Sequence, residues 1–185
     1  MSVRDEVKVA TLRVIATEGV QAVTIRRVAR EVGRSTTAIT HYFADRDQLL
    51  GEAVSESFAE LQAQLESKLA ESDDPVWAFL DWSIEADPGG VWIALVAATA
   101  AGIEPVVSEH VRVFEQWWDD RLIQLLADQS APDPRFREVA DAIGVVVDGM
   151  LLARDVPCSD ASYRRRLLRM LVGPLLVPVG EGAGR

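Results

Sequence analysis

The chain has 185 residues, nearly half of them apolar, and a formal net charge of −10. It has no apolar run of the roughly 18 residues that a membrane-spanning helix needs, and its N-terminus does not resemble a secretory signal. A single cysteine, Cys158, excludes an internal disulfide, and two histidines, His41 and His110, do not make a zinc site. We therefore expect a cytoplasmic protein without membrane contact, metal or cofactor.

The charge is distributed unevenly along the chain. The first fifty residues hold 8 Lys and Arg against 6 Asp and Glu, and the remainder holds 11 against 23. A slightly basic head on an acidic body is expected where only the head contacts phosphates and the body repels them.

The predicted elements begin with two helices. Apolar residues at helical spacing predict a first helix that ends at Gly19, a residue able to take a positive φ. Thr24 can cap a second, short helix with an apolar face that includes Val28, and Gly33 ends it.

A third and a fourth helix follow the turn at Gly33. Ser35 or Thr36 can begin the third helix, which is short and ends near Tyr42. Asp45 can cap a long fourth helix that continues to the break at residues 72–75.

The rest of the chain is divided by glycine- and proline-containing breaks, and each interval has a helical pattern. The breaks lie at residues 87–90, 102–105, 130–134, 155–157 and 173–174. No period-two alternation predicts a strand. The expected fold class is all-α, with about nine helices.

Two short helices joined by a tight glycine turn and braced by a third helix are typical of a helix-turn-helix, in which the second helix of the pair enters the major groove of DNA. Arginines on the first of the two helices suit phosphates, and hydroxyls on the second suit phosphates and base edges. The pattern therefore predicts a DNA-binding head.

Residues 24–49, TIRRVAREVGRSTTAITHYFADRDQL, resemble the DNA-binding signature of the TetR family of transcriptional regulators. The matching residues lie at the start of the second helix, on both sides of the glycine turn, and at the start of the fourth helix. They are Thr24, Val28, Ala29, Val32, Gly33, Ile39, Tyr42, Phe43, Asp47 and Leu49.

Three positions depart from the family pattern. Arg34 replaces a small apolar residue and Thr40 stands where tyrosine is common, which puts the base preference in doubt. Arg46 replaces a lysine that contacts phosphate, and we expect it to keep that role with altered geometry.

The expected DNA-binding residues combine this resemblance with the polar side chains of the motif. They are Thr24, Arg26, Arg27, Arg34, Ser35, Thr36, Thr37, Thr40, His41, Tyr42 and Arg46. No cysteine lies near His41, and no other catalytic constellation is present. We expect no enzymatic activity.

All five tryptophans lie in one segment of the acidic body. They can fill a helical core, or they can line an apolar ligand pocket with a few polar groups. The resemblance implies a small-molecule effector in this second domain, and tryptophan faces suit an apolar or cationic ligand. The candidate pocket residues are Phe58, Trp77, Trp82, Trp92, His110, Phe114, Trp117 and Asp148.

The last two predicted helices, residues 136–153 and 159–172, also allow two interpretations. Their apolar residues can form the core of the domain, or they can form a four-helix dimer interface with two helices from each subunit, as the resemblance implies. The candidate interface residues are Ile143, Val147, Met150, Leu151, Leu167, Leu168 and Leu171.

The sequence thus favours a helix-turn-helix domain at residues 1–47, a helical ligand-binding and dimerisation domain at 48–178, and a flexible tail at 179–185. The expected protein is a homodimeric repressor that binds a palindromic operator in double-stranded DNA and is released by a small molecule. Two alternatives stay open: a regulator with a vestigial pocket that a protein partner controls, and a helical small-molecule carrier.

Overall fold

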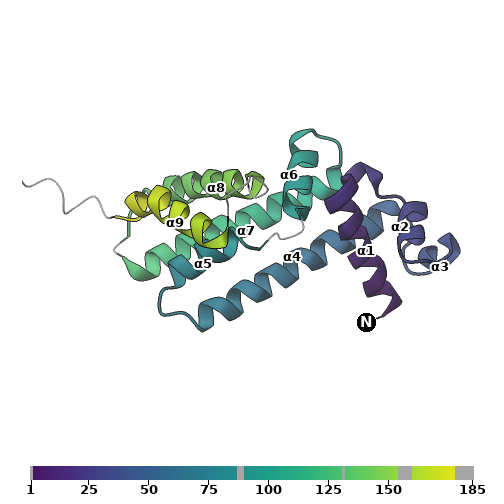
Figure 1. Ribbon diagram of the computed structural model, residues 1–185, viewed down its shortest axis with the longest axis horizontal. Helices are drawn as coiled ribbons and strands as arrows, with labels where there is room; N and C mark the ends of the chain where they lie inside the picture. Colours follow the sequence, from purple (N-terminus) through teal and green to yellow (C-terminus); the bar gives the residue numbers. More distant parts are fainter. Residues whose placement is uncertain (1, 87–89, 131, 154–159, 178–185) are drawn as a thin grey trace, which may run out of the picture. The chain divides into compact units, whose positions relative to one another are not determined.

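The computed structural model describes all residues except 1, 87–89, 131, 154–159 and 178–185. This part of the chain contains nine α-helices and no strand, which confirms the all-α prediction. The elements (Figure 1) are α1 Val3–Glu18, η1 Val20–Ala22, α2 Ile25–Glu31, α3 Thr36–Thr40, α4 Arg46–Ala70, α5 Pro75–Ser83, α6 Val91–Ala100, α7 Pro105–Gln129, α8 Phe136–Leu152, α9 Ala161–Val172 and η2 Gly173–Leu176. The break at 155–157, Cys158 and the tail from residue 179 fall outside the described residues, as do most of the break at 87–90 and Ala131 within the break at 130–134.

Contacts divide the chain into two compact units. The first unit comprises Met1–Ser67 and Asp87–Trp117, and the second comprises Lys68–Ala86 and Trp118–Arg185. The first unit therefore joins the predicted head to α6 and to the first half of α7. The functional boundaries predicted at residues 47 and 178 stay a prediction.

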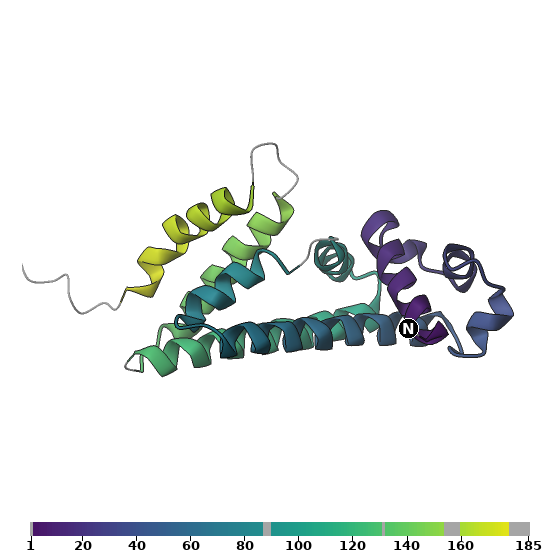
Figure 2. The same ribbon diagram turned by 60° about the horizontal axis from the view of Figure 1, so that its bottom comes forward.

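In the first unit, α1 lies beside α6 (Figure 1 and Figure 2). Ser2 and Asp5 form a capping box at the start of α1, and Gly19 ends the helix with a φ of 84°. The apolar stripe of α1, with Val7 and Val14 fully buried, packs into the core of this unit.

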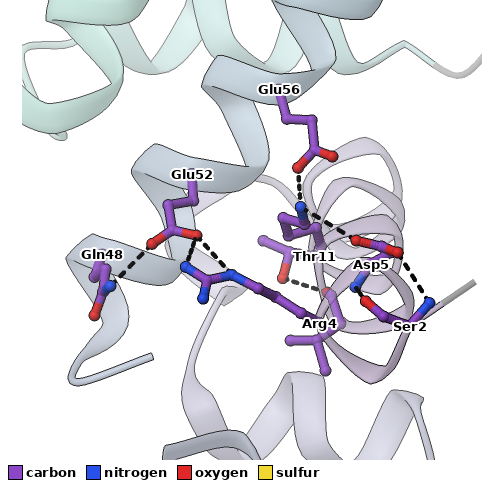
Figure 3. Close-up of polar contacts among 9 residues, drawn as sticks. Ser2, Arg4, Asp5, Thr11, Gln48, Glu52 and Glu56 are labelled. Carbon is purple, nitrogen blue, oxygen red and sulfur yellow. Dashed lines mark hydrogen bonds and ion pairs between the residues drawn. The ribbon is translucent and has the colours of Figure 1, made fainter. Parts of the chain in front are cut away.

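Ion pairs also connect α1 to α4. Figure 3 shows Arg4 of α1 directed at Glu52 of α4. Nη2 of Arg4 lies 2.5 Å from Oε2 of Glu52. One turn further along each helix, Lys8 contacts Glu56. These contacts and the apolar core hold the start of α4 against α1.

In the second unit, α9 packs on α8 and contacts α5. Leu168 and Val172 of α9 are fully buried, and Arg165 binds Glu85 while Arg169 binds Asp81. The apolar face of α9 therefore faces its own unit, and part of its arginine run pairs with the acidic residues of α5 and of the residues that follow it.

No single described helix is long and apolar enough to cross a membrane. The pair α6 and α7, bent by 114°, passes this test together by length and composition only.

Candidate functional site

Local hydrogen bonds set the geometry of α2, the turn and α3. Oγ1 of Thr24 accepts a hydrogen bond from the backbone N–H of Arg27 at 3.0 Å and caps α2. Gly33 takes a φ of 64°, and the backbone N–H of Arg34 donates to the carbonyl of Ala29 at 2.9 Å, which closes the end of α2. Oγ of Ser35 then caps α3.

The two faces of this motif differ in character. Val28, Ala29, Ile39 and Phe43 are buried in the first unit. Of the eleven residues that the sequence assigned to DNA, Arg27 and Arg46 are half-buried and nine are exposed: Thr24, Arg26, Arg34, Ser35, Thr36, Thr37, Thr40, His41 and Tyr42. The rings of His41 and Tyr42 meet edge to face, with centroids 5.1 Å apart. The arrangement presents hydroxyls, an imidazole and a phenol on one short helix and its C-terminal end.

Six of the eight basic residues in the first fifty are held by carboxylates of the same chain. The pairs are Arg4–Glu52, Lys8–Glu56, Arg13–Glu31, Arg27–Glu18, Arg34–Glu6 and Arg46–Glu104. Among the described residues, no carboxylate pairs with Arg26 or Arg30, and both side chains are exposed on α2. Arg30 was not among the predicted site residues. The helical period of the apolar residues of α2 nevertheless indicates that Arg30 faces solvent.

Arg27 is the most strongly paired arginine of α2. Its Nη2 lies 2.5 Å from Oε1 of Glu18, and its Nη1 lies 2.8 Å from Oε2 of Glu31. These hydrogen bonds raise the pKa of Arg27 and lower the pKa of both glutamates. To contact a phosphate of DNA, the guanidinium of Arg27 must therefore release the carboxylate of Glu18 or of Glu31.

Arg46 is directed into the first unit. Its guanidinium contacts the carboxylate of Glu104 and the carbonyls of Val20 and Val23. The hydrogen bonds to Glu104 raise the pKa of Arg46. In this arrangement acceptors of the first unit bind the guanidinium of Arg46, and its expected phosphate contact stays a prediction.

Four of the predicted pocket residues form an aromatic cluster in the first unit. The ring of Phe114 stacks on Phe58 with centroids 4.4 Å apart, and it lies 5.4 Å from Trp92 and 5.3 Å from Trp117. Phe58 and Phe114 are buried, whereas the two tryptophans are half-buried. This aromatic cluster, Phe58, Trp92, Phe114 and Trp117, comes from α4, α6 and α7.

The other predicted pocket residues lie elsewhere. Trp77, Trp82 and Asp148 belong to the second unit, where Trp82 is buried against Phe79. His110 lies on α7 and lines an open groove of about 560 Å³ in the first unit. None of the other predicted pocket residues lines this groove. The groove is lined by Asp47, Gln48, Gly51, Glu52, Ser55, Glu56, Ala59, Val106 and His110.

Most of the predicted dimer-interface residues are packed inside their own unit. Ile143, Val147, Met150, Leu151 and Leu168 are buried, Leu167 is half-buried and Leu171 is exposed. The first five therefore form a core, because helix packing within the protomer already covers them. The exposed apolar residues of α8 are Val145 and Leu152, at 75% and 66% exposure, and α9 adds Met170 at 67%.

Comparisons with known proteins place this geometry among DNA-binding regulators. Residues 9–53 match the family model described as bacterial regulatory proteins, tetR family. The chain is 28% identical over 152 residues to the HTH-type transcriptional regulator BetI of Burkholderia mallei, a match that covers 77% of this chain and 76% of the relative.

Solved structures show the same fold. A transcriptional regulator from Rhodococcus sp. Rha1 superposes with a TM-score of 0.80 at 21% identity, over 96% of this chain and all of that one. A regulator from Saccharomonospora viridis, solved in complex with choline, superposes with a TM-score of 0.78 at 17% identity, over 92% of this chain and 95% of that one.

Proposed function

Because the chain belongs to the TetR family of transcriptional regulators, which are DNA-binding proteins and not enzymes, we propose that it acts as a homodimeric repressor. It binds a palindromic operator in double-stranded DNA and leaves the operator when a small molecule binds. Such a regulator acts in the cytoplasm, where its DNA is.

The exposed face of α3 is the observation that carries this proposal. Thr36, Thr37, Thr40, His41 and Tyr42 are exposed while Ile39 and Phe43 anchor the helix from the other side. Hydroxyl, imidazole and phenol groups can donate to and accept from base edges and phosphates. A rigid short helix with this surface suits the major groove.

Dimer formation is supported by the exposed apolar residues of α8 and α9. Val145, Leu152 and Met170 are 75%, 66% and 67% exposed. Large exposed apolar side chains on neighbouring helices are typical of a surface that a partner covers. A second copy on this surface would give two heads related by a twofold axis, and two such heads read two half-sites of a palindrome.

The ligand class follows from the aromatic cluster. Rings of Phe58, Trp92, Phe114 and Trp117 come from three helices and contact one another. Aromatic faces attract cations, and cages of such rings recognise quaternary ammonium groups. The related regulator solved with choline agrees with this chemistry. We infer that the effector is a small cation with apolar substituents.

The effector must prefer one arrangement of the two heads, because a ligand with equal affinity for both arrangements shifts nothing. The cluster includes Phe58 of α4, and the same helix begins at Arg46 beside the helix-turn-helix. A change in the position of α4 on ligand binding would therefore reach the head.

The test is selection from randomised duplex DNA with the purified protein at two salt concentrations, followed by release experiments. An enriched palindrome and salt-dependent binding support the proposal. Choline should release the operator, whereas its uncharged carbon isostere should not. Absence of any enriched sequence would overturn the DNA-binding role in favour of a carrier, and an operator that no cation releases would favour control by a protein partner.

A further inference from the structure

We propose that Arg46 and Glu104 form a clamp that fixes the orientation of the helix-turn-helix, so that Arg46 acts as a positioning residue instead of a phosphate contact. The inference rests on the proposed function, since it concerns how the head is held for DNA binding. It differs from the sequence prediction, which assigned Arg46 to the phosphate backbone.

The hydrogen bonds of Arg46 are saturated within the first unit. Nε donates to the carbonyl of Val23 at 2.6 Å, and Nη2 donates to the carbonyl of Val20 at 3.1 Å. Nη2 and Nη1 also donate to the two carboxylate oxygens of Glu104 at 2.7 and 2.9 Å. Nη1 makes a longer contact of 3.4 Å with Asp47. A guanidinium has five N–H donors, and these five contacts occupy all of them.

The clamp joins three segments that are distant in the sequence. Arg46 is the first residue of α4, the two carbonyls belong to the connection between α1 and α2, and Glu104 directly precedes α7. The backbone N–H of Ser108 donates to the carbonyl of Glu104 at 3.0 Å, which fixes Glu104 to the first turn of α7. The clamp therefore ties the start of α2 to the helices that carry the aromatic cluster.

Glu104 is the least exposed of the carboxylates that pair with basic residues of the head, and Glu31, at 21% exposure, comes next. The side chain of Glu104 is 14% exposed and that of Arg46 is 28% exposed, whereas Glu18 and Glu6, which pair with Arg27 and Arg34, are 41% and 36% exposed. A bidentate pair in a low-dielectric setting is directional and resists exchange for a solvent-exposed phosphate. Removal of one partner leaves the other charge half-buried and without its counter-charge.

The opposite hypothesis is that Glu104 only shields Arg46 until phosphate replaces it. The two hypotheses predict opposite effects of Glu104→Gln on operator binding. If Arg46 is a positioning residue, loss of the carboxylate loosens the head and weakens binding. If Arg46 is a shielded phosphate contact, loss of the carboxylate frees the arginine and strengthens binding.

The experiment measures operator affinity against salt concentration for wild type, Glu104→Gln, Arg46→Gln, the double variant and Arg46→Lys. For a positioning clamp we expect each single variant to bind about tenfold more weakly, in the range of measured coupling between sites. The double variant should bind no more weakly than either single variant. The slope of log K against log salt should not change, because no phosphate contact is lost.

Two further variants separate the clamp from general effects of charge. Arg46→Lys keeps the charge but cannot form the forked contact, so it should behave like Arg46→Gln, whereas a phosphate contact would tolerate it. Glu109→Gln removes the partner of Arg112 in an exposed pair on α7 and serves as the matched control. Thermal unfolding of each variant checks that the fold is retained, and Arg46→Lys decides the question if a glutamine variant does not fold.

Tighter operator binding by Glu104→Gln, a slope changed by about one per protomer in Arg46→Gln, or wild-type binding by Arg46→Lys would each overturn the clamp. These results leave the proposed function intact, because they all require operator binding. Failure of the wild-type protein to bind any operator would instead overturn the proposed function.

Discussion

The guanidinium of Arg27 lies against the carboxylate of Glu18, with Nη2 2.5 Å from Oε1. This hydrogen bond is the main reason that the pKa of Glu18 lies below its ordinary value. The pair connects the last turn of α1 to α2, and therefore fixes the position of the first helix of the motif. Because the pKa of Glu18 is lowered in the folded state, the contribution of this pair to stability depends on pH.

Glu18→Gln should lower the unfolding midpoint at pH 6 and have a smaller effect at pH 3. A lowered pKa means that the folded state binds protons less readily than the unfolded state, so the contribution is complete above the ordinary glutamate pKa of about 4.3. It is lost as the pH falls through the pKa of the folded state. Thermal unfolding from pH 3 to 7 gives the comparison, and an equal effect of the variant at both ends would contradict the assignment.

Arg26→Gln and Arg30→Gln should each weaken operator binding and reduce the slope of log K against log salt by about one per protomer. Both side chains are exposed on α2, and neither is paired with a carboxylate among the described residues. Fluorescence anisotropy over a salt series measures the slope. Arg112→Gln, an exposed arginine of α7 paired with Glu109, is the control and should leave the slope unchanged.

Gly33→Ala should destabilise the protein by about 1 kcal/mol, because alanine strains the backbone at a φ of 64°. A Cβ at this position meets no atom within 4 Å, so crowding does not contribute. Gly144→Ala is the matched change in α8, where a Cβ would lie 3.8 Å from Trp118 in ordinary contact, and it should stabilise by a few tenths to about 1 kcal/mol. Denaturant unfolding that gives both variants the same sign would contradict this prediction.

Val145→Asp and Met170→Asp should convert the proposed dimer to a monomer with little loss of protomer stability, because both side chains are largely exposed. Ile143→Ala should instead destabilise the fold by about 2–5 kcal/mol, since Ile143 is fully buried. Sedimentation velocity and thermal unfolding separate the two effects. If both aspartate variants remain dimeric, the dimer interface does not include the surface with Val145 and Met170.

Phe114→Leu should weaken release of the operator by choline by about tenfold or more, because Phe114 contacts the three other rings of the aromatic cluster. Affinity for the operator without ligand should stay close to that of wild type. Phe79→Leu removes a comparable buried ring in the second unit and controls for lost packing. A ligand response lost equally in both variants would indicate a stability effect instead of a binding site.

The sequence by itself determined the local architecture of the head. Thr24 caps the second helix as expected, Ser35 is the cap among the two candidates for the third, and Gly19 and Gly33 end the helices before them. These features depend on hydrogen bonds and φ values within a few residues, so they are readable without knowledge of the rest of the fold. The helical period likewise gave the all-α class.

Only the tertiary structure decided which partners distant side chains take. Glu104 lies 58 residues from Arg46, and nothing in the local pattern distinguishes an arginine that faces solvent from one that binds a carboxylate inside the protein. On α8 the period places apolar residues on more than one side, and packing against the rest of the unit buries Ile143 while it leaves Val145 exposed. Contacts between residues far apart in the chain depend on how the helices assemble, and that assembly is not encoded within a single helix.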